Sequence, residues 1–357
     1  MEFWALYLPA FHRIKENDEW WGEGFTEWDN VKKGRPFFSG HKQPMVPLNG
    51  YYDLANVETL AMQAEIANKY GVDGFIFYHY WFKNGKKLLE KPAEMLLKNK
   101  DINIKFSFCW ANEPWARTWD GKNKDVLMSQ DYGGIEDWIE HIKYLAEFFR
   151  DPRYHKINGK PVIYIYSASR IPEFDSMIRT WNNYLISVGL KELYIIEFIS
   201  SFNLDLYSSL TDSVLEFEPL YTTRFDISLF RKIKRLLCKK IGLIDYQDYD
   251  HLWSMIINRR RNYNGRDIVR SCFVGWDNSP RKGKNSMVVL GSSPEKFHHY
   301  LLKLATSKRN NLSNHLLVIN AWNEWGEGAV LEPTLLYRYG YLEAIKEVKI
   351  QLNSKIE

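Results

Sequence analysis

The sequence contains only three cysteines in 357 residues, Cys109, Cys238 and Cys272. An odd number at wide spacing argues against a disulfide framework and against a zinc site built from cysteine pairs. No apolar run reaches the roughly 18 to 20 residues that a membrane-spanning helix needs. The first residues, MEFWALYLPAFH, lack the features of a signal peptide. We therefore expect a cytoplasmic protein.

The chain also lacks a strong charge of either sign. Its 48 Lys and Arg are nearly balanced by 44 Asp and Glu, which leaves a net charge of +4. This balance gives no reason to expect a nucleic-acid partner. Aromatic residues are plentiful instead: Trp, Tyr and Phe make up 16% of the chain, and many Trp stand beside charged or amide residues. Such a mixture is typical of sugar-binding clefts, although many of these rings will also lie in the core.

Short apolar runs with β-propensity recur along the chain and alternate with helical patterns. The expected strands are Phe3–Leu8, Gly74–Tyr80, Ile104–Cys109, Pro161–Tyr166, Leu193–Phe198, Val214–Phe217, Ser271–Gly275 and Leu316–Ala321. Apolar residues at helical spacing mark Asn56–Tyr70 and Ile135–Phe149 as helices between them. Eight alternating units predict an α/β fold, a (β/α)8 TIM barrel, formed by one domain over residues 1–357. A doubly wound sheet is the main alternative, but no GxGxxG turn supports it.

The segment 228–261 differs in character and is predicted to be an insertion in the barrel. It begins with a basic amphipathic helix. Its apolar stripe is Leu229, Phe230, Ile233, Leu236, Leu237 and Ile241, bordered by Arg231, Lys232, Lys234, Arg235, Lys239 and Lys240. Residues 228–241 could rest on an anionic membrane surface and make the protein peripheral to the inner membrane. They could equally pack on the barrel with a solvated outer face.

Polar and aromatic side chains cluster directly after the expected strands, which in a barrel is the rim where active sites are built. The candidates for substrate binding are His12, Trp28, His79, Tyr80, Trp110, Asn112, Glu113, Arg117, Asp120, Asn323 and Trp325. The candidates for catalysis are Glu324 and Glu327 in the sequence NEWGEG. Glycoside chemistry requires two carboxyl groups at one cleft, one protonated to donate to the leaving oxygen and one ionised to act as base or nucleophile.

Other chemistries find less support in the sequence. His12, His79, Glu113 and Asp120 could assemble a metal site, but no HExxH or CxxC spacing accompanies them, and we expect neither a metal nor a cofactor. His79, within FYHYW, could instead be a hydrogen-bonded residue of the barrel. No GxSxG motif supports a serine hydrolase. The acidic triplet at 248–250 matches a short metal-binding pattern of nucleotide-sugar transferases, but three residues carry almost no information.

Together these stretches resemble the WbsX-like proteins of bacterial surface polysaccharide clusters, whose fold is related to glycoside hydrolase family 99, the endo-α-mannosidases. The resemblance covers nearly the whole chain. It rests on YLPAFHRIKENDEWWGEGFTEWDNV, GHKQPMVPLNGYYDL, GFIFYHYWF, FCWANEPWARTWDG and NAWNEWGEGAVLEP. The narrower resemblance to family 99 rests on NEWGEG and on GWDNSPR, which adds Trp276 and Asp277 to the expected substrate-binding residues.

The resemblance to family 99 implies a barrel and a retaining reaction without metal. In that family one glutamate deprotonates the sugar 2-hydroxyl, which attacks its own anomeric carbon to give a 1,2-anhydro sugar, and a second acts as acid and then base. Carried onto this chain, Glu324 is the base and Glu327 the acid/base. Gly326 stands where the hydrolases commonly carry His. The residues alone do not separate this route from direct attack by a carboxylate.

The sequence thus predicts an enzyme of O-antigen or capsule assembly that cleaves or transfers a glycosidic bond. Its expected partner is an oligosaccharide or a lipid-linked glycan, and the acceptor is either water or a sugar. Two alternatives remain open. One is a glycosyltransferase that depends on a nucleotide-sugar or lipid-linked donor, and the other is a glycan-binding protein without turnover.

Overall fold

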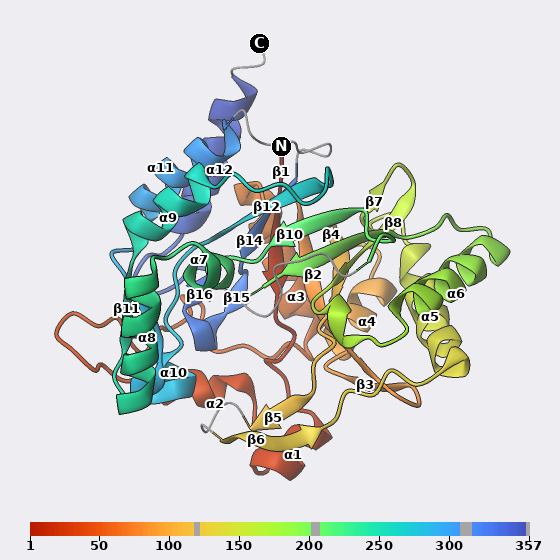
Figure 1. Ribbon diagram of the computed structural model, residues 1–357, viewed down its shortest axis with the longest axis horizontal. Coiled ribbons are helices and arrows are strands. Elements are labelled where there is room, and N and C mark those ends of the chain that lie inside the picture. Colours follow the sequence, from red (N-terminus) through yellow and green to blue (C-terminus); the bar gives the residue numbers. More distant parts are fainter. Residues whose placement is uncertain (118–121, 201–207, 308–315, 355–357) are drawn as a thin grey trace.

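The computed structural model describes residues 1–117, 122–200, 208–307 and 316–354 (Figure 1). Eight parallel strands form its centre. They are β1 (Glu2–Tyr7), β2 (Gly74–Phe82), β4 (Lys105–Trp110), β8 (Lys160–Ile165), β9 (Tyr194–Ile199), β10 (Ser213–Glu216), β12 (Asp267–Phe273) and β14 (Leu316–Asn320). Each strand pairs with the next, and β14 pairs back onto β1 with Glu2 opposite Leu316. The sheet is therefore closed, which confirms the predicted (β/α)8 TIM barrel.

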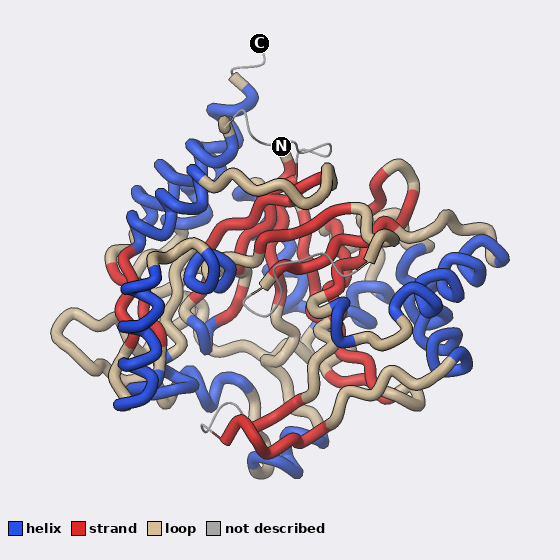
Figure 2. Tube along the Cα trace, viewed as in Figure 1, coloured by secondary structure: helices blue, strands red, loops and turns tan. Residues whose placement is uncertain are grey.

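Helices alternate with these strands and cover the outside of the barrel, as the blue and red segments of Figure 2 show. They are α3 (Val57–Tyr70), α4 (Lys91–Lys98), α5 (Ile135–Phe149), α6 (Phe174–Ser187), α7 (Leu220–Phe225), α9 (Tyr249–Asn258), α11 (Pro294–Ala305) and α12 (Gly340–Asn353). Local signals set their ends. In α3, the Asn56 side chain accepts a hydrogen bond from the Glu58 amide, and Gly71 ends the helix in the left-handed conformation with φ 85°.

The connections at the carboxyl ends of the strands are elaborate and lie in the lower half of Figure 1, away from the N-terminus. They contain α1 (Lys15–Trp21), α2 (Glu27–Lys32), β3 (Lys86–Leu88), β5 (Trp115–Arg117), β6 (Lys122–Met128), η2 (Ala168–Arg170), α10 (Ser279–Lys282), η3 (Gly283–Asn285), β15 (Asn323–Glu324), η4 (Trp325–Glu327) and β16 (Ala329–Val330). At the opposite rim β7 (Lys156–Ile157) pairs with β8. Chain outside the regular barrel is thus concentrated where barrel enzymes build their sites.

The segment 228–261 lies between β10 and β12 and holds α8 (Leu229–Ile241), β11 (Asp245–Asp248) and α9. Strand β11 pairs in parallel with β13 (Met287–Leu290) in a small separate sheet. Helix α9 packs against α7 and α11 in the outer layer, whereas α8 lies at the edge of the molecule beside β11 (Figure 1). No helix in the described part of the chain is both long enough and apolar enough to cross a membrane.

Candidate active site

A tight hairpin at the end of β14 carries the two candidate catalytic glutamates. Strands β15 and β16 pair antiparallel, with Glu324 opposite Ala329, and η4 connects them, so that Glu324 and Glu327 stand at the two ends of one short turn. The Asn323 side chain fixes this hairpin to the end of β1, because it accepts from the Leu8 amide at 2.7 Å and donates to the Leu8 carbonyl at 3.0 Å. The last strand and the first strand together thus position both carboxyl groups.

Arg281 joins the two glutamates. Its Nη1 lies 2.9 Å from Glu327 Oε1 and its Nη2 lies 3.4 Å from Glu324 Oε2, while its Nε donates to Glu27 Oε1 at 2.6 Å. Arg281 comes from the single-turn helix α10, and Glu27 is the first residue of α2, whose N-cap is Thr26. One buried guanidinium, from the connection after β12, therefore contacts three carboxyl groups from two other connections of the barrel.

Gly326 makes this contact possible. A Cβ at this position would lie 2.3 Å from Glu27 Oε1 and 2.6 Å from Arg281 Nε, both far closer than van der Waals contact. The ion pair occupies the space that a side chain at residue 326 would need. This is a physical reason for glycine at residue 326.

The two glutamates and Arg281 line a cavity of about 290 Å³ at the carboxyl ends of the strands. This volume is close to the lower limit of about 300 Å³ for pockets that hold small ligands. Aromatic and apolar side chains form most of its wall: Leu8, Trp21, Tyr78, Tyr80, Trp115, Leu127, Tyr166, Phe217 and Leu220. Flat rings around a pair of carboxyl groups suit a ligand with both apolar and hydroxyl-bearing faces, such as a sugar ring.

Burial changes the acid–base properties of these groups. The pKa of Glu324 is raised from 4.5 to about 8, mainly by burial; Arg281 opposes the rise, and the negative charges of Glu327 and Glu27 add to it. Burial also raises the pKa of Glu27, again against the effect of Arg281. Glu324 is therefore protonated in most molecules at neutral pH, whereas an ordinary glutamate is ionised.

Two further predicted site residues reach this cavity. Tyr80 and Glu113 line it together with the glutamates. The Glu113 carboxylate lies 3.3 Å from Arg170 Nε, and burial raises its pKa. Burial likewise raises the pKa of Tyr80, so its hydroxyl remains protonated and can donate a hydrogen bond.

Several other candidates are buried beside the cavity and support it without lining it. Asn112 donates to the Ser167 carbonyl at 2.8 Å and accepts from the Ser167 amide, which ties the connection after β4 to that after β8. Asn323 holds the hairpin, as described above. Trp28 donates to the Tyr52 carbonyl and packs against Trp325, which in turn donates to Glu332 at 2.8 Å. These hydrogen bonds and ring contacts hold the connections around the cavity in place.

The structure places three candidates away from the cavity. His79 Nε2 lies 2.9 Å from His141 Nε2 of α5, and burial lowers its pKa to about 3, so it is a neutral residue between barrel and helix. Trp110 packs against the same His141 and against Trp181 of α6. His12 is buried and does not line the cavity; burial lowers its pKa to about 4. The expectation that these three contact substrate directly finds no support in this geometry.

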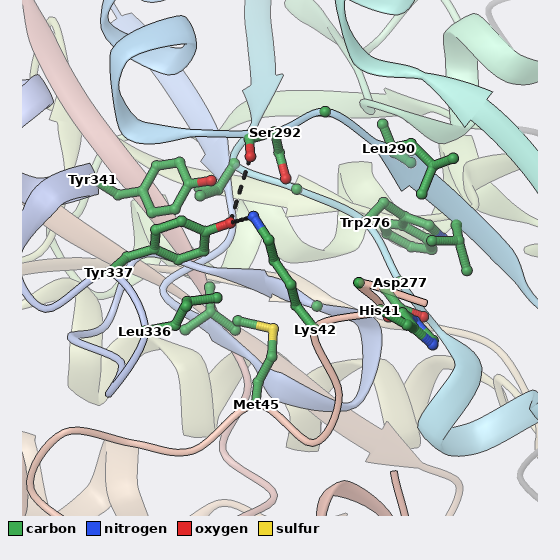
Figure 3. A pocket seen from close by; sticks show the side chains of 18 of the residues that line it. His41, Lys42, Met45, Trp276, Asp277, Leu290, Ser292, Leu336, Tyr337 and Tyr341 are labelled. Atoms are coloured by element: carbon green, nitrogen blue, oxygen red, sulfur yellow. Dashed lines mark hydrogen bonds and ion pairs between the residues drawn. The ribbon is translucent and has the colours of Figure 1, made fainter. Parts of the chain in front are cut away.

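Trp276 and Asp277 line a second, smaller cavity of about 140 Å³ (Figure 3). Asp277 Oδ2 accepts from Gln43 Nε2 at 2.8 Å and lies 2.7 Å from His41 Nε2. Its backbone amide donates to the Glu327 carbonyl at 2.6 Å, so Asp277 holds the turn that carries Glu327 in place. The other wall of this cavity includes Tyr337 and Tyr341.

Two candidates fall at the edge of the described residues. Arg117 is the last residue of β5, and its side chain is not among those described. Asp120 lies outside the described residues. Elsewhere in the described ranges, no group of three or more His, Cys, Asp or Glu side chains is arranged to hold a metal ion.

The acidic triplet at 248–250 has structural contacts. Asp248 caps α9 by accepting from the His251 amide, Tyr249 is buried, and Asp250 lies 2.6 Å from Lys296 Nζ. Nothing in these contacts indicates a nucleotide-sugar site.

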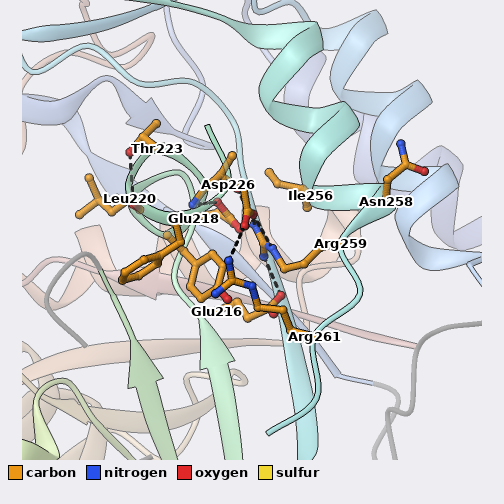
Figure 4. A network of polar contacts seen from close by, with 12 residues as sticks. Glu216, Glu218, Leu220, Thr223, Asp226, Ile256, Asn258, Arg259 and Arg261 are labelled. Atoms are coloured by element: carbon orange, nitrogen blue, oxygen red, sulfur yellow. Dashed lines mark hydrogen bonds and ion pairs between the residues drawn. The ribbon is translucent and has the colours of Figure 1, made fainter. Parts of the chain in front are cut away.

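A second buried polar network is centred on Arg259 (Figure 4). Arg259 lies 2.7 Å from Glu216, 2.6 Å from Glu218 and 2.7 Å from Asp226, and its guanidinium stacks over the Tyr221 ring. This network fixes the connection from β10 to α7, the segment that supplies Phe217 and Leu220 to the cavity.

Comparison with known proteins assigns the chain to a family. The family model described as "Glycosyltransferase WbsX" matches residues 3–345. The chain belongs to the WbsX glycosyltransferase family. Two relatives, both named WxcX and described as uncharacterized, come from strains B100 and ATCC 33913 of Xanthomonas campestris pv. campestris. They are 34% and 35% identical over 96% of this chain, and the match covers 49% of each relative. The chain thus spans about half the length of these relatives.

Solved structures share the barrel. A glycoside hydrolase-like protein superposes with a TM-score of 0.59 at 16% identity, over 97% of this chain and 93% of the other. The GH99 endo-alpha-mannosidase from Bacteroides thetaiotaomicron superposes with a TM-score of 0.54 at 13% identity, over 99% and 98%. Identities this low show the fold alone. WbsX family membership together with this fold supports a carbohydrate-active enzyme.

The most important residue that the sequence analysis did not place in the site is Arg281. It ends the GWDNSPR stretch, but its charge alone gives no indication that it contacts carboxyl groups 43 and 46 residues further along the chain. Tyr78 and Tyr166, which also line the cavity, were missed because they lie within apolar runs that read as core.

Proposed function

We propose that this WbsX family protein cleaves or transfers a glycosidic bond with retention of configuration, using Glu324 and Glu327, in the assembly of a bacterial surface polysaccharide. The observation that carries the proposal is the convergence of both carboxyl groups on one buried guanidinium inside an aromatic cavity. A site of this kind can hold one carboxyl protonated and another ionised at the same time, which acid and base catalysis on an acetal requires.

The proposed reaction starts from the form in which Glu324 is ionised and Glu327 is protonated, which is the minor form at neutral pH because burial favours the protonated state of Glu324. In this form Glu324 takes the proton of the sugar 2-hydroxyl while that oxygen attacks the anomeric carbon. The bond to the leaving oxygen breaks as Glu327 donates its proton to that oxygen. The 1,2-anhydro ring is then opened at the anomeric carbon by water or by an acceptor hydroxyl, whose proton passes to Glu327. Glu324 returns its proton to the 2-oxygen, and both groups regain their starting states.

Arg281 would act as a positioning residue in this scheme. Its hydrogen bond to Glu327 fixes that carboxyl, and its positive charge partly opposes the rise in the pKa of Glu324. A base with a pKa near 8 is a stronger proton acceptor than an ordinary carboxylate, but only its ionised fraction is active.

We further propose that the substrate is an oligosaccharide or a lipid-linked glycan and that the protein works in the cytoplasm. One observation supports this location. All three cysteines are free thiols, and two of them are buried, as suits a reducing compartment.

The second candidate is glycosyl transfer from an activated donor. The family description, a glycosyltransferase, favours it. In that reaction the same cavity would bind the donor sugar, and one glutamate would activate the acceptor hydroxyl as a base. A glycan-binding protein without turnover is less well supported, since binding alone does not require a glutamate with a strongly raised pKa.

The experiment is mass spectrometry of α-linked oligosaccharides incubated with the wild type, with Glu327→Gln and with Glu343→Gln, an exposed glutamate of α12 as control. Reactions run first in water alone and then with added acceptor sugars. Shortened or elongated glycans from the wild type and the control, but not from Glu327→Gln, support the proposal. Full activity of Glu327→Gln contradicts it. Turnover only after a nucleotide-sugar or lipid-linked donor is added selects the second candidate.

A further inference from the structure

The amphipathic helix α8 presents its apolar face to solvent. All six residues of the apolar stripe are exposed, from Ile233 at 49% to Phe230 at 77%. They are Leu229, Phe230, Ile233, Leu236, Leu237 and Ile241, which we call the α8 ridge. Leu243, just beyond the helix, is exposed as well. Single exposed apolar residues are ordinary, but a contiguous row of them marks an interaction surface.

The opposite face of α8 is basic, and this is the face that holds the helix to the protein. Arg235 donates to the Thr223 carbonyl at 2.9 Å and lies 3.2 Å from Asp245. Lys232 donates to the Phe225 carbonyl at 3.4 Å. A surface helix of a globular protein normally does the reverse and buries its apolar stripe. The fold therefore anchors α8 by its polar side and leaves the α8 ridge available.

We propose that α8 is a membrane-docking helix, which lies in the headgroup region of a bilayer rich in anionic lipids with the α8 ridge inserted. The charge of the helix supports a lipid surface: residues 229–241 contain six Lys and Arg and no Asp or Glu. An interfacial helix of this composition gains from both apolar burial and attraction to anionic headgroups.

The positions of two lysines distinguish a membrane from a protein partner. Lys240 falls within the angular range of the α8 ridge on a helical wheel, Lys234 falls at its border, and both residues are exposed. The buried centre of a protein interface is depleted of Lys. At a bilayer, by contrast, a long Lys side chain buries its methylenes and reaches the phosphate groups with its ammonium. A bilayer therefore accommodates both the apolar side chains of the α8 ridge and the two lysines beside them.

The docking face lies close to the catalytic side of the barrel. Gly242 ends α8 at its carboxyl end, and a Cβ added to this glycine would lie 3.6 Å from Asn285 Oδ1 of η3. Helix η3 directly follows α10, the helix that carries Arg281. Docking through α8 would thus bring the catalytic rim near the membrane surface. The inference rests on α8 alone and does not depend on the proposed reaction.

The test is co-sedimentation of the full chain with vesicles of pure phosphatidylcholine and of an equal mixture of phosphatidylcholine and phosphatidylglycerol. The ridge variant Phe230→Gln/Leu236→Gln removes apolar contacts, and the charge variant Lys234→Gln/Lys240→Gln removes two cations. The control Arg179→Gln/Ile186→Gln changes one basic residue and one exposed apolar residue on α6. Every side chain changed is exposed, so all variants are expected to fold, which thermal unfolding verifies.

We expect the wild type to bind the anionic vesicles and not the neutral ones. The affinity of the charge variant for anionic vesicles should be lower on the order of 30-fold. The affinity of the ridge variant should fall by more than roughly tenfold. The control should bind like the wild type. Failure of the wild type to bind anionic vesicles overturns the proposal, as does equal binding by the ridge variant and the wild type. Light scattering adds a third outcome: a wild-type dimer that the ridge variant converts to a monomer would make the α8 ridge a protein interface. Glu327→Gln must bind vesicles like the wild type, which separates this test from that of the reaction.

Discussion

Replacement of Glu324 by Gln should make the protein more stable at high pH while removing its activity. Glu324 is buried, and the fold raises its pKa from 4.5 to about 8. The folded state therefore keeps a proton that the unfolded chain loses between these pH values. Stability contributed by the protonated carboxyl is fully present below about pH 4.5 and is lost as the pH rises through 8. Gln keeps the size of the side chain but has no proton to lose.

The size of the effect follows from the shift. One unit of pKa corresponds to about 1.4 kcal/mol, and relaxation of a protein interior around a new charge reduces the penalty. We therefore expect Glu324→Gln to exceed the wild type in free energy of unfolding by about 2 to 4 kcal/mol above pH 8. Below about pH 4.5 the added stability should be absent, because both side chains are then neutral.

Urea denaturation of both proteins at pH 5, 7 and 9 measures this difference, with the exposed Glu343→Gln as control. The difference between wild type and Glu324→Gln should grow with pH, and the control should show no such trend. A difference that stays constant across the range, or that shrinks as pH rises, would refute the electrostatic reasoning about Glu324.

Three further results are expected. If Glu324 is the base, kcat/KM should rise as the pH increases towards about 8, whereas a fall through the same range would assign it the acid role. Gly326→Ala should reduce activity at least tenfold and lower the unfolding free energy by about 1 to 3 kcal/mol, because the new Cβ displaces the ion pair beside it. Gly134→Ala is the control, since a Cβ there meets nothing within 4 Å. Equal activity of the two variants would contradict the argument. Arg259→Met should lower the free energy of unfolding by about 3 to 5 kcal/mol in chemical denaturation, since it leaves buried carboxyl groups without their cation. An unchanged denaturation midpoint would show that Arg259 does not stabilise these carboxyl groups in the folded state.

Much of the fold could be predicted because the barrel strands are buried on both faces and so appear as nearly continuous apolar runs. The expected and observed strands overlap in all eight cases, and the boundaries differ by a few residues. For example, the strand expected at Gly74–Tyr80 extends to Phe82. The two candidate catalytic glutamates could be placed at the rim because they follow the last strand directly, where the chain must leave the barrel.

Side-chain direction could not be predicted by listing residues at a strand end. In β2, Tyr78 and Tyr80 line the cavity, whereas His79 between them points to α5 and meets His141. Successive side chains of a strand point to opposite faces, so neighbours in FYHYW cannot all reach one cavity. The alternation was available in the sequence, but which set faces inward depends on the register of the closed barrel.

The contact among Glu27, Arg281 and the NEWGEG turn shows why three separate stretches of sequence act as one unit. Arg281 contacts all three carboxyl groups only because Gly326 leaves space for its guanidinium and for Glu27. Without Arg281, three acidic groups would share a buried site with no cation, and the raised pKa values of Glu27 and Glu324 would rise further. A side chain at residue 326 would also separate Arg281 from these carboxyl groups, because its atoms would occupy the space that the ion pair needs. Changes at these positions should therefore be strongly non-additive, and a relative that carries a larger residue in place of Gly326 must arrange its glutamates around a different partner.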